Sequence, residues 1–117
     1  MQIETANTIL YCTHWKEMVR FYREVLTLDI LFENDWFVEF KLSDNARLSV
    51  ADEERASIKS NKGKGITISL RITSLQKLIQ YMKEYNYKPS PIKKIWGKDQ
   101  FFVFDPEGNR IEFWTDD

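Results

Sequence analysis

The chain contains little cysteine, histidine and glycine, and each shortage excludes a class of protein. One cysteine, Cys12, among 117 residues cannot form an internal disulfide, so the chain is not a disulfide-stabilised scaffold. A single histidine, His14, gives a Ser–His–Asp catalytic triad little support. The segment Gly63-Lys64-Gly65 lacks the surrounding pattern of a phosphate-binding loop. Cys12 itself is expected to be a small packing residue rather than a nucleophile, because no histidine partner is apparent.

Long apolar runs and an excess of positive charge are also missing. No apolar stretch approaches the roughly 20 residues that a membrane span needs, and the N-terminus lacks a signal-peptide pattern. Lys and Arg number 17 against 18 Asp and Glu, for a net charge of −1, and no basic patch favours nucleic acid. We therefore expect a cytoplasmic protein with neither a nucleic-acid nor a membrane partner.

The sequence contains an internal repeat with an offset of about 60 residues. Under this offset Phe21 falls over Tyr81 and Glu24 over Glu84, and Arg47 meets Arg110 after a shift of three. A repeat of this length predicts two similar modules that share one core or face each other across a pocket.

Both modules show the same order of elements, βαβββ. Short turn signals and alternating apolar residues separate the strands, and Thr13 and Ser74 are the expected N-caps of the helices. Residues 52–64 are charged and predict a mobile connector, and whether it acts as a lid is left open. The expected elements are a strand at 3–11, a helix at 15–25 and strands at 28–33, 36–42 and 46–51, then a strand at 65–72, a helix at 74–85 and strands near 91–96, 99–104 and 109–115.

Two segments carry a family likeness that covers essentially the whole chain. FYREVLTLDI (21–30) resembles the FY-x-x-V-L-G-L stretch of the glyoxalase / bleomycin-resistance / extradiol-dioxygenase superfamily, also called the vicinal oxygen chelate superfamily. FFVFDPEGNRIEFW (101–114) resembles its closing DP-x-G-N-x-I-E hairpin. Thr27 departs from the pattern, because the family usually has glycine there.

The resemblance implies an α+β fold in one domain. Modules 1–51 and 65–117, joined by connector 52–64, would form a curled mixed sheet with a concave pocket, and the helices would cover its convex side. Short members of the family usually pair as homodimers, sometimes by swapping modules. Metal-dependent members chelate a divalent cation with four side chains from the first and last strands of each module.

The repeat places those four positions at Asn7, Ser49, Thr67 and Glu112. Only Glu112 is a usual ligand, and neutral hydroxyls bind transition metals poorly. We therefore predict no metal and no other cofactor. Glu112 would be a catalytic base if the protein is an enzyme; the alternative is that it pairs with a nearby arginine.

Strand alternation predicts which side chains line the concave face. An arginine fork there would bind carboxylate or phosphate, although Glu112 could instead simply neutralise an arginine. Trp36 and Trp96 occupy matching positions in the two modules. Either both pack in the core, or both form the wall of a pocket or of a dimer interface. Phe102 is a weaker candidate for the same wall. The remaining expected ligand-binding residues are Arg47, Ser49, Thr67, Arg71, Arg110 and Trp114.

The first functional hypothesis is a metal-independent protein that binds a small planar, possibly anionic, organic molecule in the cup, as bleomycin-resistance proteins sequester a drug. Bleomycin itself is a poor fit, because it is cationic and this chain is not strongly acidic. The alternative is a lyase, isomerase or dioxygenase that depends on a metal or on Glu112, with Tyr11 as a second acid–base candidate. A regulatory or structural dimer with a vestigial cup is a third possibility.

Overall fold

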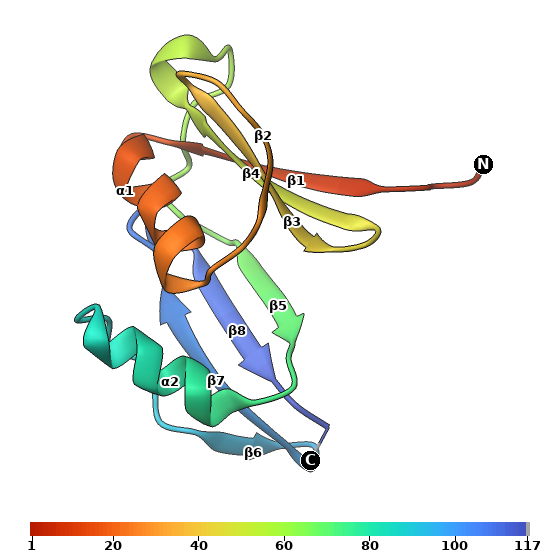
Figure 1. Ribbon diagram of the computed structural model, residues 1–117, viewed down its shortest axis with the longest axis vertical. Coiled ribbons are helices and arrows are strands. Elements are labelled where there is room, and N and C mark those ends of the chain that lie inside the picture. The colour runs from red at the N-terminus through yellow and green to blue at the C-terminus, as the bar shows by residue number, and fades with distance from the viewer. Residues whose placement is uncertain (117) are drawn as a thin grey trace. The chain divides into compact units, whose positions relative to one another are not determined.

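The computed structural model describes residues 1–116, and the chain divides between Lys62 and Gly63 into two compact units (Figure 1). Unit 1 is residues 1–62, and unit 2 begins at Gly63. Among the described residues, no helix is both long and apolar enough to cross a membrane.

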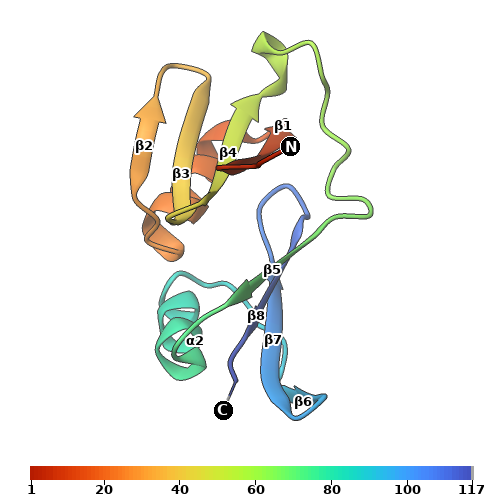
Figure 2. The same cartoon turned by 90° about the vertical axis from the view of Figure 1, so that its right-hand side faces the viewer.

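Unit 1 contains one four-stranded sheet and a helical segment. The sheet has the order β1-β4-β3-β2; β1 runs parallel to β4, and the other pairs are antiparallel (Figure 2). Its elements are β1 (Ala6–Cys12), α1 (Trp15–Arg20), the π-helical turn η1 (Phe21–Val25), β2 (Ile30–Glu33), β3 (Phe37–Ser43), β4 (Ala46–Asp52) and the 3₁₀ turn η2 (Glu53–Arg55).

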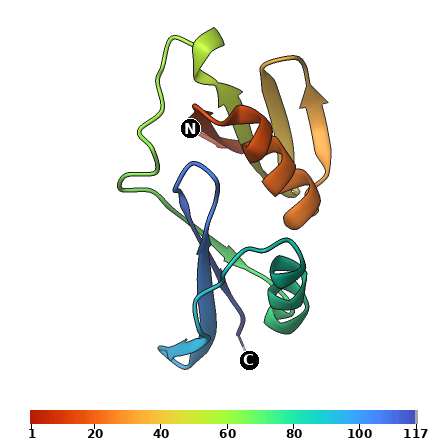
Figure 3. The ribbon, with the colours of Figure 1, turned by 90° about the vertical axis from the view of Figure 1, so that its left-hand side faces the viewer.

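Unit 2 repeats this topology, with the sheet order β5-β8-β7-β6 and β5 parallel to β8. Figure 3 shows α2 alongside one face of this sheet. The elements are β5 (Thr67–Arg71), α2 (Leu75–Glu84), β6 (Lys93–Ile95), β7 (Lys98–Phe104) and β8 (Arg110–Trp114). The predicted α+β fold, βαβββ twice, is confirmed, and the element boundaries differ from those expected by three residues at most.

One side of the helical segment of unit 1 is buried. Its buried residues are Met18, Val19, Phe21, Tyr22 and Val25, which recur three and four residues apart as on an amphipathic helix. After Arg20 the α-helix continues as the π-helical turn η1.

The core of unit 2 confirms the alternation predicted for the last strand. Ile111 and Phe113 are buried, whereas the residues between them in β8 stay partly exposed. Phe113 stacks on Phe101 of the neighbouring strand, with ring centroids 5.2 Å apart, and Leu75 and Met82 of α2 are buried as well. One face of β8 is therefore core, and the other is available for binding.

The turn between β7 and β8 is held by the carboxylate of Asp105. Its Oδ1 accepts hydrogen bonds from the backbone N–H of Glu107 at 3.0 Å and of Asn109 at 2.9 Å, and its Oδ2 accepts one from Asn109 Nδ2 at 2.8 Å. Gly108 supplies the positive φ of 94° that this turn requires. The acidic residue and the glycine of the DP-x-G-N motif thus have structural roles.

One local expectation is wrong, and two other segments show features that the sequence does not specify. Thr13 is not the N-cap of α1: His14 takes that place without a side-chain cap, and Thr13 Oγ1 lies 3.0 Å from His14 Nδ1 instead. Thr27 adopts the left-handed conformation, at φ 55°, despite its branched side chain. The connector expected to be mobile contains η2, after which Lys59 Nζ donates to the carbonyl of Glu53 at 2.7 Å.

Candidate functional site

The exposed face of β8 carries the densest group of predicted site residues. β8 lies between β5 and β7, so each of its residues has a neighbour on both sides. Glu112 has Ser69 and Phe102 as its Cα partners, and Arg110 has Thr67 and Phe104. We call the group Ser69, Phe102, Arg110 and Glu112 the β8 site.

Glu112 is oriented by two neighbours. Its Oε1 accepts a 2.7 Å hydrogen bond from Ser69 Oγ, and its Oε2 lies 3.8 Å from Arg110 Nη2. The second distance is short enough for an ion pair but too long for a hydrogen bond. Arg110 therefore offsets the negative charge of the carboxylate, while Oε2 can still accept a hydrogen bond. The Glu112 side chain keeps 21% of its surface exposed and is therefore accessible from solvent.

Arg110 is stacked, and one of its donors is unsatisfied. Its guanidinium carbon lies 4.2 Å from the centre of the Phe102 ring, a cation–π arrangement. Its Nε is buried and has no hydrogen-bond partner among residues 1–116. An unsatisfied buried donor costs roughly 1–3 kcal/mol. The rest of the Arg110 side chain is partly exposed, so a ligand oxygen that displaced the groups covering Nε would recover that energy.

Arg71 does not join Arg110 in a single fork. The register pairs Thr67 with Arg110 and Arg71 with Trp114, so the two arginines stand four residues apart along the ladder, about 13 Å. The ladder thus separates Arg71 from Arg110 along the sheet. The separation follows from strand register, which alternation alone does not determine.

Arg71 belongs to a second cationic–aromatic cluster at the end of β8. Arg71 and Lys98 lie over the Trp114 ring, at 5.7 Å and 4.8 Å from its centre, and both pair with Asp116. The hydrogen bond from Lys98, helped by the charge of Arg71, holds the pKa of Asp116 below its ordinary value. These cations are thus already paired with Asp116, whereas the ion pair of Arg110 with Glu112 leaves Nε without a hydrogen bond among residues 1–116.

The equivalent face of unit 1 is arranged differently. Ser49, which is fully buried, donates a 2.9 Å hydrogen bond to Asn7 Oδ1. Arg47 Nη1 donates to the backbone carbonyls of Ser43 at 2.8 Å and Asp44 at 3.1 Å, so this arginine holds the β3–β4 turn.

Glu39 on β3 is a residue of this face that sequence reasoning missed. It is the Cα partner of Ser49, and its Oε2 lies 3.6 Å from Arg47 Nε. The alternation of β3, with Val38 and Phe40 buried on the opposite face, was the signal that could have found it.

The donors at the four family metal positions do not fit a transition-metal centre. They comprise one amide, two hydroxyls and one carboxylate. Across residues 1–116, no group of three or more His, Cys, Asp and Glu side chains is placed to hold a metal ion. No step of the chemistry below is therefore routed through a metal.

The paired tryptophans occupy the tips of corresponding hairpins. Trp36 precedes β3, is partly buried and lies 5.6 Å from the Phe37 ring. Trp96 lies between β6 and β7 and is 94% exposed, so core packing does not explain its position. Neither belongs to the β8 site.

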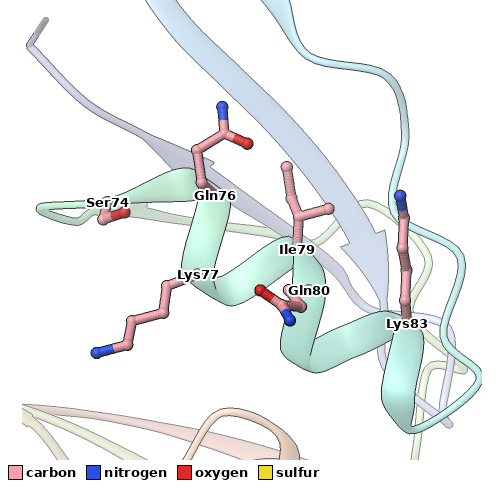
Figure 4. A pocket seen from close by; sticks show the side chains of 6 residues that line it. All are labelled: Ser74, Gln76, Lys77, Ile79, Gln80 and Lys83. Carbon is pink, nitrogen blue, oxygen red and sulfur yellow. The ribbon is translucent and has the colours of Figure 1, made fainter.

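A hollow of about 500 Å³ runs along α2 (Figure 4). Figure 4 shows Gln76 and Ile79 pointing from one side of the helix and Lys77 from the other. Because these side chains diverge, they do not form a converging set of binding groups. The lining residues are Ser74, Gln76, Lys77, Ile79, Gln80 and Lys83.

Comparison with known proteins agrees with this fold. A model of the Glyoxalase/Bleomycin resistance protein/Dioxygenase superfamily matches residues 4–113, whereas no curated protein matches the chain. A lactoylglutathione lyase from Agrobacterium tumefaciens is 17% identical with a TM-score of 0.75, covering 94% of this chain and 91% of its own.

Two further solved structures show the same architecture. The oxidase ChaP-H2 is 17% identical with a TM-score of 0.77, over 98% of this chain and 94% of its own. A glyoxalase / bleomycin resistance protein from Catenulispora acidiphila is 15% identical with a TM-score of 0.74, over 95% and 96%. At these identities the likeness establishes the fold, that of the vicinal oxygen chelate proteins, and leaves activity to be argued from the residues.

Proposed function

Because the chain belongs to the Glyoxalase/Bleomycin resistance protein/Dioxygenase superfamily, we propose that it binds a small planar organic anion at the β8 site without a metal. The observation that carries this proposal is the buried Nε of Arg110, which has no acceptor among the described residues although its guanidinium is fixed over Phe102. Sequestration of such a molecule, without chemical change, is the function proposed. If the ligand is an antibiotic, the protein would confer resistance.

The Arg110 guanidinium is prepared for a carboxylate. Stacking on Phe102 restricts the orientation of the guanidinium plane, so less side-chain entropy is lost when a ligand binds. A carboxylate can accept from Nε and a terminal nitrogen together, in the bidentate geometry that arginine favours. The Phe102 ring and the guanidinium plane also offer flat surfaces against which a planar ligand packs.

Glu112 limits the charge of the ligand. A second anionic group near its Oε2 would be repelled, whereas a hydroxyl or amide N–H could donate to it. The β8 site therefore suits a monoanion with a hydrogen-bond donor close to its acid group, such as a hydroxy- or amino-substituted aromatic acid.

A thermal-shift screen of aromatic monocarboxylates, followed by calorimetry, tests the proposal. Hydroxybenzoates should raise the melting temperature of the wild type, and Arg110→Ala should lose this shift, with Kd raised at least tenfold. Arg110→Lys should recover little, since an ammonium cannot form the fork. Arg20→Ala removes an exposed arginine paired with Glu24 on the helical segment of unit 1 and should bind as the wild type does. Unchanged binding by Arg110→Ala would refute the proposal.

A second candidate function is proton transfer by Glu112, in a lyase or isomerase. The 2.7 Å bond from Ser69 supports it, because it orients the carboxylate while leaving Oε2 accessible. A dioxygenase or another metal-dependent enzyme is less well supported by the donor set at the family positions.

Glu112→Gln separates the two candidates. If the protein sequesters an anion, removing the neighbouring negative charge should tighten severalfold the binding of benzoate, which has no hydrogen-bond donor for Glu112. If Glu112 is a base, the same variant should bind its substrate but no longer turn it over.

A further inference from the structure

One edge of the unit 2 sheet concentrates positive charge. β6 is the outermost strand of that sheet, and we call residues 88–98, which include β6 and the turn after it, the basic edge. The basic edge contains four lysines and neither an acidic residue nor an arginine. The charge balance of the whole chain, from which we expected no membrane partner, conceals this local excess.

Half of the positive charge on the basic edge is uncompensated. Lys88 and Lys93 are exposed and have no acidic partner within residues 1–116. The other two lysines do have acidic partners; these pairs are Lys94–Asp99, at 3.2 Å, and Lys98–Asp116. The basic edge therefore presents two unpaired ammonium groups to solvent.

The basic edge also exposes apolar surface. Ile92 and Ile95 are 38% and 37% exposed, and Trp96 at the hairpin tip is 94% exposed. A single exposed apolar residue is ordinary on a protein surface. Three of them within five residues, beside unpaired lysines, indicate a surface that contacts something both apolar and negatively charged.

Trp96 holds an unfavourable backbone conformation. Trp96 and Gly97 form the two-residue turn between β6 and β7, with φ angles of 52° and 76°. Asn-Gly is the sequence that such a turn favours, and a bulky residue at positive φ is strained. Because the exposed indole buries little surface in unit 2, packing within the unit does not offset this strain. Its position indicates a role outside the unit.

The basic edge is distinct from the β8 site. The Trp96-Gly97 turn precedes the first residue of β7, whereas Arg110 pairs with Phe104 at its last residue. β7 is seven residues long, so about 20 Å separates these two places along the strand. Figure 2 shows the β6–β7 turn and the β7–β8 turn at opposite ends of β7. The two surfaces can therefore be tested separately.

We propose that the basic edge binds the surface of a membrane that contains anionic lipid headgroups. The lysine charges attract such a surface over about one Debye length, roughly 8–10 Å at ordinary salt. Trp96 then lies among the headgroups, a place that indole favours because it is apolar with one hydrogen-bond donor. The lysine side chains can bury their apolar stems there while their ammonium groups stay at the phosphates.

The composition of the basic edge favours a lipid surface over a protein or nucleic-acid partner. Arginine recognises single carboxylates and phosphates with a fixed fork, and the basic edge has no arginine. Lysine is a compact point charge, which suits the diffuse charge of a headgroup layer. A membrane also offers apolar surface directly beneath that charge, so Trp96 and the two isoleucines need no shaped pocket.

Co-sedimentation with vesicles tests the proposal. The wild type should bind mixed phosphatidylcholine–phosphatidylserine vesicles and stay in solution with phosphatidylcholine alone. Binding should decrease as salt is raised, since exposed charges are screened. Tryptophan emission should shift to shorter wavelength on binding, because Trp96 leaves water.

Trp96→Asn isolates the contribution of the tryptophan. Asn-Gly is favoured in this turn, so the variant keeps the hairpin and should be at least as stable as the wild type in urea. It should bind the mixed vesicles severalfold more weakly and lose the emission shift, although three other tryptophans remain. Its binding of hydroxybenzoates should be unchanged, because Trp96 lies outside the β8 site.

Charge reversal isolates the contribution of the lysines. Lys88→Glu/Lys93→Glu should lower vesicle affinity by at least about tenfold, since each lysine near an anionic surface contributes on the order of fivefold. Lys77→Glu/Lys83→Glu on α2, where Figure 4 shows both lysines, makes the same change in net charge outside the basic edge. This control variant should retain most of the binding.

Three results would overturn the proposal. They are a wild type that stays in solution with the mixed vesicles at low salt, a Trp96→Asn variant that binds them as tightly as the wild type, and equal losses of binding for the two charge-reversed variants. A wild type that ignores the vesicles but binds a single-stranded oligonucleotide through Trp96 would assign the basic edge to nucleic acid instead.

Discussion

Asp105 is predicted to stabilise unit 2 through its side chain. It is 4% exposed and accepts three hydrogen bonds, two from backbone N–H groups and one from Asn109 Nδ2. Hydrogen bonds to a charged group contribute about 1.5–3 kcal/mol each, and bonds that share one acceptor group are not additive. We therefore expect Asp105→Ala to lower the free energy of unfolding by about 3–4 kcal/mol, a combined estimate from those values.

Asp105→Asn separates the contribution of the two backbone hydrogen bonds from that of the bond with Asn109. The amide oxygen can replace Oδ1 and keep both backbone bonds, but the amide nitrogen would face the Asn109 donor. The expected cost is therefore smaller, about 1–2 kcal/mol, the value of one lost bond to a buried group. Urea unfolding followed by circular dichroism measures both variants, with the m-value checked for constancy.

Asp44 provides the matched control, because it begins the β3–β4 turn of unit 1 as Asp105 begins the β7–β8 turn of unit 2. It lies in the turn between β3 and β4, and its side chain is 91% exposed. Asp44→Ala should change stability by less than about 0.5 kcal/mol. Equal losses for Asp105→Ala and Asp105→Asn, or a loss below about 1 kcal/mol for Asp105→Ala, would refute the reasoning.

Three further predictions concern a turn, a charge cluster and the β8 site. Thr27→Gly should raise the free energy of unfolding by about 1 kcal/mol, since glycine adopts the φ of 55° without strain; a lower urea midpoint would contradict this. The pKa of Asp116 is depressed in the folded state, so its stabilisation is present above the unfolded pKa of 3.8 and is lost as pH falls through the folded pKa. The stability difference between wild type and Asp116→Asn should therefore shrink in acid, and a difference that persists below both pKa values would argue against the pairing. Ser69→Ala should free Glu112 to pair more closely with Arg110 and weaken monocarboxylate binding severalfold in calorimetry, while tighter binding would contradict the proposed geometry.

The fold was predictable because its signals are local. Alternation along residues 109–115 identified β8 and its buried face, and the DPEGN turn followed from the preferences of proline and glycine. The repeat then extended each assignment to the other module. The π-helical turn at Phe21–Val25 escaped prediction, because its sequence also fits an α-helix.

The candidate site was only partly predictable because it depends on register. Alternation placed Arg71 and Arg110 on one face, but only the pairing of β5 with β8 shows that they lie at opposite ends of the ladder. The buried Nε of Arg110 depends on a rotamer over Phe102, which no sequence pattern encodes. The sequence left Trp96 either to core packing or to the wall of a pocket or dimer interface, and its exposed place in the turn excludes the first.

The Nε–H of Arg110 tests the central claim most directly. Its ¹H–¹⁵N resonance is assigned by its absence from the spectrum of Arg110→Lys. The resonance can then be followed while a hydroxybenzoate that binds the protein is added in increasing amounts. A new hydrogen bond to a carboxylate should move the Hε signal downfield and slow its exchange with water, saturating at one ligand per chain. A ligand that binds the protein while this resonance stays unchanged would contradict the account.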